Sequence, residues 1–196
     1  MRSRLRERAD ECVDYQVARA NDRWFEHKVR TLTTAGIIAW YHPDTLLDPA
    51  CGDGSIIIAA DRLSPIRSAT LSDISVGSVG LAQNAGDDHG WVIQIEDAHD
   101  ALAGSGRVDV VVLTEFLEHV PDPEAYLRLA RQVGTHLVAS SPLIEPPRQD
   151  GNPEHLWAFD NESYLEMLAD TGWSADICQN LMIHSGYYNF QVWGCS

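Results

Sequence analysis

The chain has 196 residues, of which 44% are hydrophobic, and this length suits one domain with a single large core. Its 14 basic and 29 acidic side chains leave a formal net charge of −15. Nucleic-acid binding draws most of its affinity from basic patches, so this charge argues against tight binding of nucleic acid. No apolar run approaches the roughly 18 residues of a membrane span. We expect a globular protein without a membrane span, whose oligomeric state the sequence leaves open.

The N-terminal residues and the cysteines indicate a cytoplasmic protein. The first eight residues include arginines but no apolar segment of the kind that a signal peptide needs. The cysteines, Cys12, Cys51, Cys178 and Cys195, are scattered and form no Cys-x-x-Cys pair. Such cysteines are typical of free thiols in a reducing compartment.

The N-terminal part of the sequence predicts helices. Residues 4–40 carry an imperfect apolar face at helical spacing, and a second short helix is predicted over 33–41, ended by Pro43. We expect residues 1–45 to form a helical lid region that covers or flanks a sheet. Residues 46–196 are expected to form the core of the same single domain.

Residues 46–55, Leu-Leu-Asp-Pro-Ala-Cys-Gly-Asp-Gly-Ser, predict a strand end, a tight turn and a helix start. Gly52 and Gly54 let the backbone take positive φ and come close to a ligand. The following helix N-terminus carries partial positive charge and suits an anionic group. A ligand-binding turn is therefore expected here.

The same stretch lacks the sequence features of two common sites, the phosphate-binding loop and the dinucleotide-binding turn. A phosphate-binding loop needs Lys-Ser or Lys-Thr after its glycines, and none is present. A dinucleotide fingerprint needs a third glycine where this chain has Ile57. A ligand with a positive centre, a carboxylate and a ribose suits the turn better.

An acidic residue follows each of the next two predicted strands. Asp73 lies about 20 positions past the glycine turn, where a carboxylate commonly accepts hydrogen bonds from ribose hydroxyls. Its alternative role is to cap the helix predicted over 76–84, for which Ser75 is equally suited. Asp97 follows the third strand, where a polar turn is the alternative.

The run Val-Asp-Val-Val-Val-Leu at 108–113 predicts a central parallel strand buried on both faces. Glu115, Glu118 and His119 follow it. Ligands of open α/β sheets lie beyond the carboxyl ends of the strands, so these side chains are expected to point toward the site. The other predicted elements are helices over 55–63, 124–133 and 162–169, strands over 46–48, 69–71, 91–95, 135–140, 173–182 and 187–193, and a loop over 141–153.

Three stretches resemble class I S-adenosylmethionine-dependent methyltransferases. Residues 46–55 resemble their motif I, usually Asp/Glu-x-Gly-x-Gly-x-Gly, with Ala50 at the first glycine. Residues 114–124 resemble the Glu-x-Leu-Glu-His-Val-x-Asp-Pro stretch of methyltransferases acting on small molecules, including ubiquinone-pathway O-methyltransferases. Residues 154–159 resemble the His-x-x-x-Phe segment of the same enzymes. The resemblance covers about residues 40–196.

The resemblance implies an α/β fold with a Rossmann-like, doubly wound sheet of seven strands, mostly parallel with an antiparallel last strand. It implies S-adenosylmethionine as cofactor and methyl transfer to a small-molecule acceptor, most readily at oxygen, with nitrogen and carbon left open. Asp73 would hold the ribose, and Asp97 with Ala98 would bind the adenine. The residues expected at the cofactor are Asp48, Ala50, Gly52, Gly54, Asp73, Ile74, Asp97, Ala98, Thr114 and Glu115.

His119 is the first candidate for the base that removes the acceptor proton, because an imidazole accepts a proton near neutral pH. His155 is the second candidate, and Glu118 completes the predicted catalytic group. A purely structural role for either histidine is the alternative.

Glu115, Glu118 and His119 stand at positions i, i+3 and i+4, which share one face if the segment is helical. With His155 they resemble the metal ligands of small-RNA 3′-terminal 2′-O-methyltransferases, so a metal-dependent enzyme of that type is one alternative. Many relatives with this motif need no metal, and we expect none here.

Three further functions are alternatives. A subunit that binds S-adenosylmethionine without catalysis stays open. Asp-Pro-Ala-Cys-Gly also resembles DNA adenine-N6 methyltransferases, but Thr114-Glu115-Phe116-Leu117 stands where those carry Asn/Asp-Pro-Pro-Tyr/Phe. A dehydrogenase is disfavoured by the missing third glycine.

Overall fold

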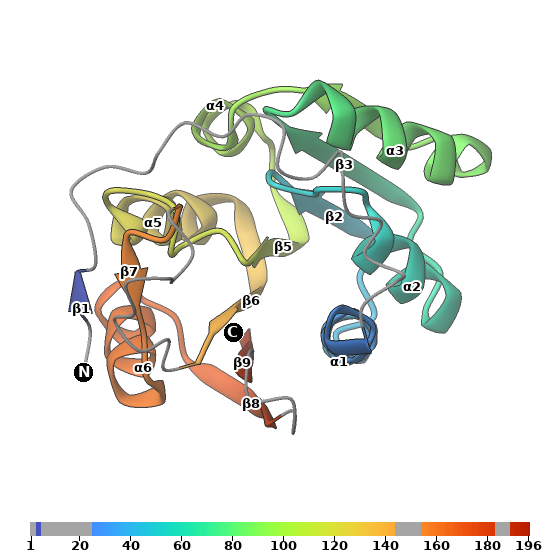
Figure 1. Cartoon of the computed structure of the whole chain (residues 1–196). Helices are drawn as coiled ribbons and strands as arrows, with labels where there is room; N and C mark the ends of the chain where they lie inside the picture. The colour runs from blue at the N-terminus through green and yellow to red at the C-terminus, as the bar shows by residue number, and fades with distance from the viewer. Residues whose placement is uncertain (1–2, 5–24, 144–153, 183–188) are drawn as a thin grey trace.

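The computed structural model describes residues 3–4, 25–143, 154–182 and 189–196 (Figure 1). None of the described helices is long and apolar enough to cross a membrane. The elements are β1 (Ser3–Arg4), α1 (Phe25–Trp40), β2 (Thr45–Asp48), α2 (Ser55–Leu63), β3 (Ser68–Asp73), α3 (Val76–Gly86), a 3-10 turn (Asp87–His89), β4 (Val92–Ile95), α4 (Ala98–Gly104), β5 (Val108–Thr114), α5 (Pro123–Val133), β6 (Gly134–Pro142), β7 (Trp157–Ala158), α6 (Asn161–Asp170), β8 (Ala175–Met182) and β9 (Asn189–Cys195).

Seven strands form the central sheet in the order β4-β3-β2-β5-β6-β9-β8. The first five of these run parallel, whereas β9 is antiparallel to both β6 and β8. This confirms the predicted sheet, because β9 is also the last strand of the chain. β1 and β7 form a separate two-stranded pair that the sequence does not predict.

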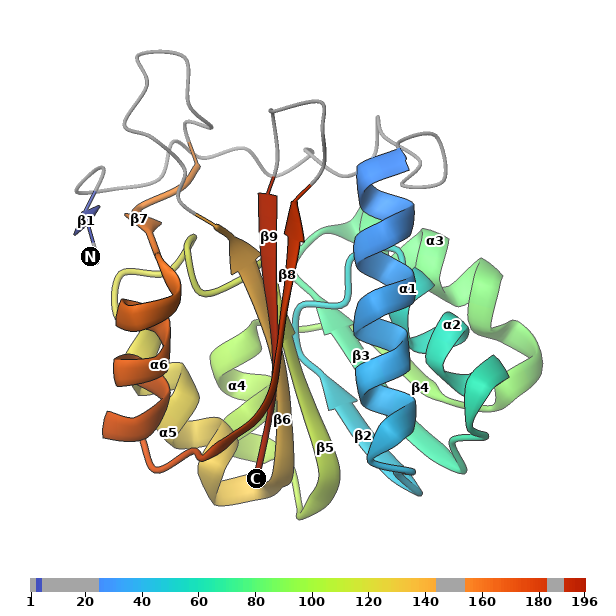
Figure 2. The same ribbon diagram turned by 90° about the horizontal axis from the view of Figure 1, so that it is seen from below.

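Helices cover both faces of the sheet. α1, α2 and α3 lie on one face and α4, α5 and α6 on the other (Figure 2). One core packs Ile38 and Ile57 against Val110 of β5, and the other packs Leu127 against Val111. Since alternate residues of a strand face opposite sides, β5 supplies both cores, which explains its continuous apolar run.

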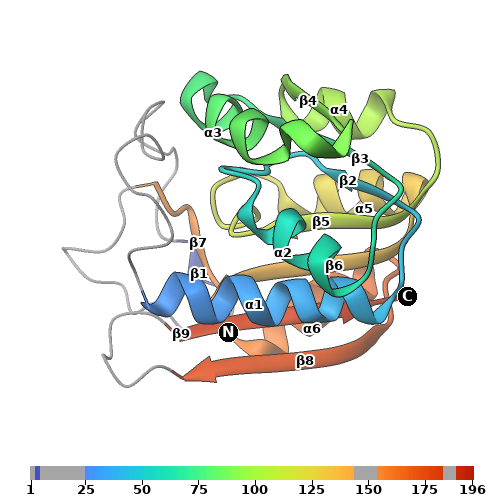
Figure 3. The same cartoon turned by 90° about the vertical axis from the view of Figure 1, so that its right-hand side faces the viewer.

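The N-terminal half differs from the prediction in three places. α1 is one helix where the sequence predicts two, and Arg4 belongs to strand β1; residues 5–24 lie outside the described part of the chain. The short helix α4 was not predicted, because seven residues are too few to show a clear helical period. α1 runs along β6 and β9 (Figure 3). The boundary between a lid and a core at residue 45 stays a prediction.

The carboxyl ends of the parallel strands meet at one edge of the sheet. The loops that follow β2, β3, β4 and β5 therefore lie near one another. Asp48 and Asp73 end β2 and β3, Asp97 lies in the loop after β4, and Glu115 directly follows β5. The predicted acidic site residues therefore all stand at this edge.

Candidate active site

The turn after β2 has the conformation that its glycines predict. Gly52 and Gly54 have φ angles of 54° and 72°, in the left-handed region that favours glycine. A Cβ on Gly54 would lie 3.2 Å from the Cβ of Ala82, so α3 packs closely against the turn. A Cβ on Gly52 would meet nothing within 4 Å, which leaves open space beside this residue.

Asp73 ties the glycine turn to the next loop. Its Oδ2 accepts a hydrogen bond from the Gly52 N–H at 3.0 Å, and its Oδ1 accepts from the Ser75 N–H at 2.8 Å. The Ser75 hydroxyl accepts in turn from the Ser78 N–H at 3.3 Å, so Ser75 caps α3. The carboxylate of Asp73 thus stands beside the open space at Gly52.

Asp48 is a buried carboxyl at the end of β2, with only 1% of its surface exposed. Burial raises the pKa of the Asp48 carboxyl to about 8, and the charge of Asp73 adds to the rise. A hydrogen bond from the Ala50 N–H, at 3.3 Å, lowers this pKa but does not offset the burial. Asp48 is therefore mostly protonated at neutral pH.

The loops after β3 and β4 add an apolar and an acidic side chain. Ile74, directly after Asp73, is 61% exposed. Asp97 caps α4 by accepting from the His99 N–H at 2.8 Å. Ala98 is the first residue of this helix, where backbone N–H groups have no acceptor within the helix.

Glu115 follows the buried Thr114 at the end of β5 and has a φ angle of 51°, which is strained for a residue with a side chain. Its Oε2 lies 3.0 Å from Nη1 of Arg30, and its Oε1 accepts from the Ser140 hydroxyl at 2.8 Å. Its N–H donates to the Ser140 carbonyl at 3.0 Å. These contacts join α1, β5 and β6.

Arg30 is a site residue that the sequence analysis missed. It is 8% exposed, and its guanidinium lies 5.3 Å from the centre of the Phe190 ring. Arg30 stands four, seven and eight positions before the buried residues Thr34, Ile37 and Ile38. This spacing places it on the buried face of α1 and could have revealed it.

Glu118, His119 and His155 come together on the loop after β5 and the segment before β7. One potential ligand atom from each lies within 4.8 Å of the others. The two imidazole rings meet edge to face with centroids 4.7 Å apart. The N–H groups of Leu156 and Trp157 donate to the Glu118 carbonyl at 2.7 and 3.3 Å, which holds the two segments together.

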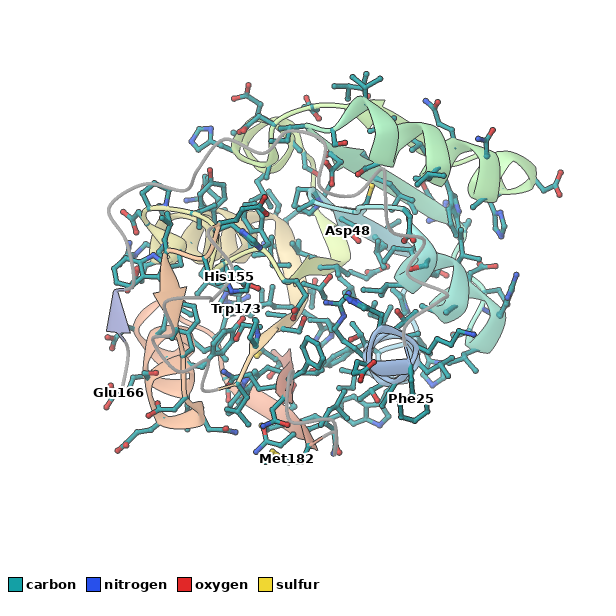
Figure 4. The ribbon with its side chains drawn as sticks, in the orientation of Figure 1. Phe25, Asp48, His155, Glu166, Trp173 and Met182 are labelled. Atoms are coloured by element: carbon teal, nitrogen blue, oxygen red, sulfur yellow. The ribbon has the colours of Figure 1, made fainter. Side chains whose placement is uncertain are left out.

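This cluster contains all three residues predicted to be catalytic. Glu118 and His155 are buried, whereas His119 is partly exposed. Figure 4 shows His155, on the segment before β7, apart from Asp48 at the end of β2. Glu115, the fourth residue of the metal alternative, is engaged instead by Arg30 and Ser140.

Comparison with known proteins identifies the family. A family model described as a methyltransferase domain matches residues 15–176. The chain belongs to this methyltransferase family. Membership confirms the resemblance to class I S-adenosylmethionine-dependent methyltransferases and the expectation of an enzyme. No curated protein matches the chain.

Solved structures share the fold. Magnesium protoporphyrin IX methyltransferase from Synechocystis PCC 6803, with bound SAH, has a TM-score of 0.70 at 17% identity over 93% of this chain and 92% of that one. The proposed methyltransferase in a complex with the Haloferax volcanii Trm112 methyltransferase activator has a TM-score of 0.72 at 15% identity, over 95% of this chain and 97% of that one. An O-methyltransferase family protein from Burkholderia thailandensis has a TM-score of 0.63 at 16% identity, over 88% of this chain and 57% of that one. Such identities show a common fold only.

Proposed function

We propose that this methyltransferase transfers a methyl group from S-adenosylmethionine to a hydroxyl group of a small molecule. One observation carries the proposal. At the carboxyl edge of one sheet, the chain combines an open glycine turn beside a carboxylate with a cluster of Glu118, His119 and His155. The first feature suits the donor and the second suits the acceptor.

The residues around the glycine turn fit the donor. The open space at Gly52 suits its amino-acid end, and the Asp73 carboxylate beside it suits two ribose hydroxyls. The exposed Ile74 suits the face of an adenine ring, while Asp97 and the Ala98 N–H suit the adenine edge. When bound, the donor supplies a methyl group activated by a positively charged sulfur. The supporting residues at this edge are Asp48, Ala50, Gly54, Thr114 and Glu115.

The Glu–His–His cluster suits removal of a proton from the acceptor. His119 is the more exposed of the two histidines and would take the proton of the acceptor hydroxyl. The Glu118 side chain is buried beside both imidazoles and would stabilise the positive charge that His119 gains with the acceptor proton. His155 packs against the His119 ring and would fix its orientation.

Donor binding and methyl transfer test the proposal separately. We expect D73A to weaken S-adenosylmethionine binding at least about tenfold in calorimetry, a loss of about 1.4 kcal/mol. H119A is expected to leave binding unchanged and to lower methyl transfer to a panel of phenols and alcohols by roughly 10²- to 10⁴-fold. H42N is the matched control, because His42 is exposed and its φ of 49° suits asparagine.

Two outcomes would reject parts of the proposal. Tight donor binding without transfer to any acceptor would favour a binding subunit without catalysis. Equal activity of H119A and H42N would remove His119 as the base.

A second candidate is a metal-dependent methyltransferase, which the closeness of Glu118, His119 and His155 favours. Two imidazoles and a carboxylate suit Mn²⁺ or Zn²⁺, and a bound cation would lower the proton affinity of an acceptor diol. We would add MnCl₂ or ZnCl₂ to chelator-treated protein and measure its melting temperature. A rise that E118Q and H155A abolish supports the metal, and no change in melting or activity rejects it.

A further inference from the structure

β4 forms one edge of the sheet and carries exposed apolar side chains. Among the described strands it pairs with β3 alone. Val92 and Ile95 are 53% and 57% exposed, and the alternation of a strand places them on opposite faces of the sheet. Both sides of this edge are therefore apolar and open, which is the property that invites addition of another strand.

α3 extends the apolar surface, because it packs beside β4 and exposes Val76 and Leu81. Figure 2 shows β4 and α3 together at one end of the molecule. We call the four residues Val76, Leu81, Val92 and Ile95 the β4 edge.

The stretch of chain that contains the β4 edge is acidic. No lysine or arginine occurs between Arg67 and Arg107, a stretch that includes β3, α3, β4 and α4. The same stretch contains six acidic residues, namely Asp73, Asp87, Asp88, Glu96, Asp97 and Asp100. An apolar strand edge within a stretch of chain that has acidic side chains but no lysine or arginine is complementary to a strand that carries apolar and basic side chains.

We propose that the β4 edge is the docking surface for a different protein that adds a β-strand bearing apolar and basic residues. Apolar contact with Val92 and Ile95 would supply affinity, and the acidic surroundings would steer the partner and select its charge. Ile95 pairs in register with Asp73, so β4 alone would separate the docked strand from Asp73, whose carboxylate accepts from the Gly52 N–H of the glycine turn. Docking itself does not depend on methyl transfer.

A second copy of the chain fits this surface less well. Each copy carries a net charge of −15, and pairing two β4 edges would bring the two acidic stretches together. Like charges facing each other across an interface cost free energy and discriminate against that partner.

A labelled peptide of about ten residues with alternating valine and lysine would probe the docking surface of the full chain. We expect saturable binding in fluorescence anisotropy, weakened by salt, and no binding of a peptide with glutamate in place of lysine. V92S/I95S should weaken binding at least tenfold. L32S/L63S, which changes two equally exposed apolar residues on α1 and α2, should bind like the wild type. In hydrogen exchange, the bound peptide should protect the amides of residues 92–95.

Four results would overturn the proposal. They are absence of binding at millimolar peptide, equal binding by both double variants, and protection elsewhere than at 92–95. The fourth is protection of the amides of residues 92–95 in the free chain, which would mean that the edge is already covered. Sedimentation would then identify what covers it: a second copy if the protein is a dimer, and the chain's own residues if it is a monomer. Because the exchange experiment uses the wild type, it decides the question even if V92S/I95S folds poorly.

Discussion

At the scale of single residues, Asp48 and Asp109 illustrate how opposite pH behaviour arises from one type of side chain. Burial raises the pKa of Asp48 from 3.8 to about 8. At Asp109, burial also raises the pKa, but hydrogen bonds from Thr45 and Asp44 outweigh it, so the pKa is lowered. The two side chains should therefore shift the pH dependence of stability in opposite directions.

We predict that D48N gains stability over the wild type as pH rises from about 4 to about 8. In this window the unfolded chain releases the Asp48 proton while the folded chain retains it, so the wild type loses up to about 1.4 kcal/mol per pH unit. Urea denaturation at about pH 5 and about pH 8 measures the difference. A constant difference between D48N and the wild type would contradict the raised pKa.

D109N is the comparison of opposite sign. The lowered pKa of Asp109 stabilises the fold above the ordinary pKa of an aspartate, and this contribution is lost as pH falls through the lowered value. D109N should therefore be less stable than the wild type at neutral pH and approach it in acid.

At the scale of elements, the pair of Arg30 and Glu115 fastens α1 to the carboxyl ends of β5 and β6. R30M is expected to destabilise the protein by about 3 kcal/mol, because removing one partner leaves the other charge largely buried. Urea denaturation of R30M, E115Q and the double variant measures the coupling between them. We expect a coupling energy of about 1–3 kcal/mol, and strict additivity of the two single variants would show that the pair is unimportant.

The sequence predicts elements well where a pattern is local. The apolar run of β5 and the turn chemistry of Gly52 and Gly54 each depend on a few neighbouring residues, and both are found where expected. The prediction of a seven-stranded sheet with an antiparallel last strand follows from the family resemblance, because pairing across the sheet leaves no local pattern in one sequence.

Contacts between distant segments could not be predicted in the same way. The proximity of His155 to His119 depends on backbone hydrogen bonds between two loops, and the engagement of Glu115 depends on Arg30 of α1. Nothing in the sequence between these residues specifies their distance. The position of Asp73 beside the glycine turn could be predicted because Asp73 ends the strand that pairs with β2. Its role in ribose binding stays a prediction.

At the scale of the whole molecule, the excess of acidic side chains opposes compaction. With 29 acidic and 14 basic groups, mutual repulsion is greater in the folded chain than in the expanded one. Salt screens this repulsion, since the Debye length is near 30 Å at 0.01 M and about 10 Å at 0.1 M ionic strength. We predict that raising NaCl from about 0.01 M to about 0.1 M raises the melting temperature by about 2–4 °C, the shift expected for about 1 kcal/mol in a domain of this size.

D88N/D100N, which removes two exposed charges from the acidic stretch around β4, should melt higher than the wild type at low salt and respond less to added NaCl. A melting temperature that falls with salt, or an equal salt response of the two proteins, would mean that local ion pairs outweigh the net repulsion.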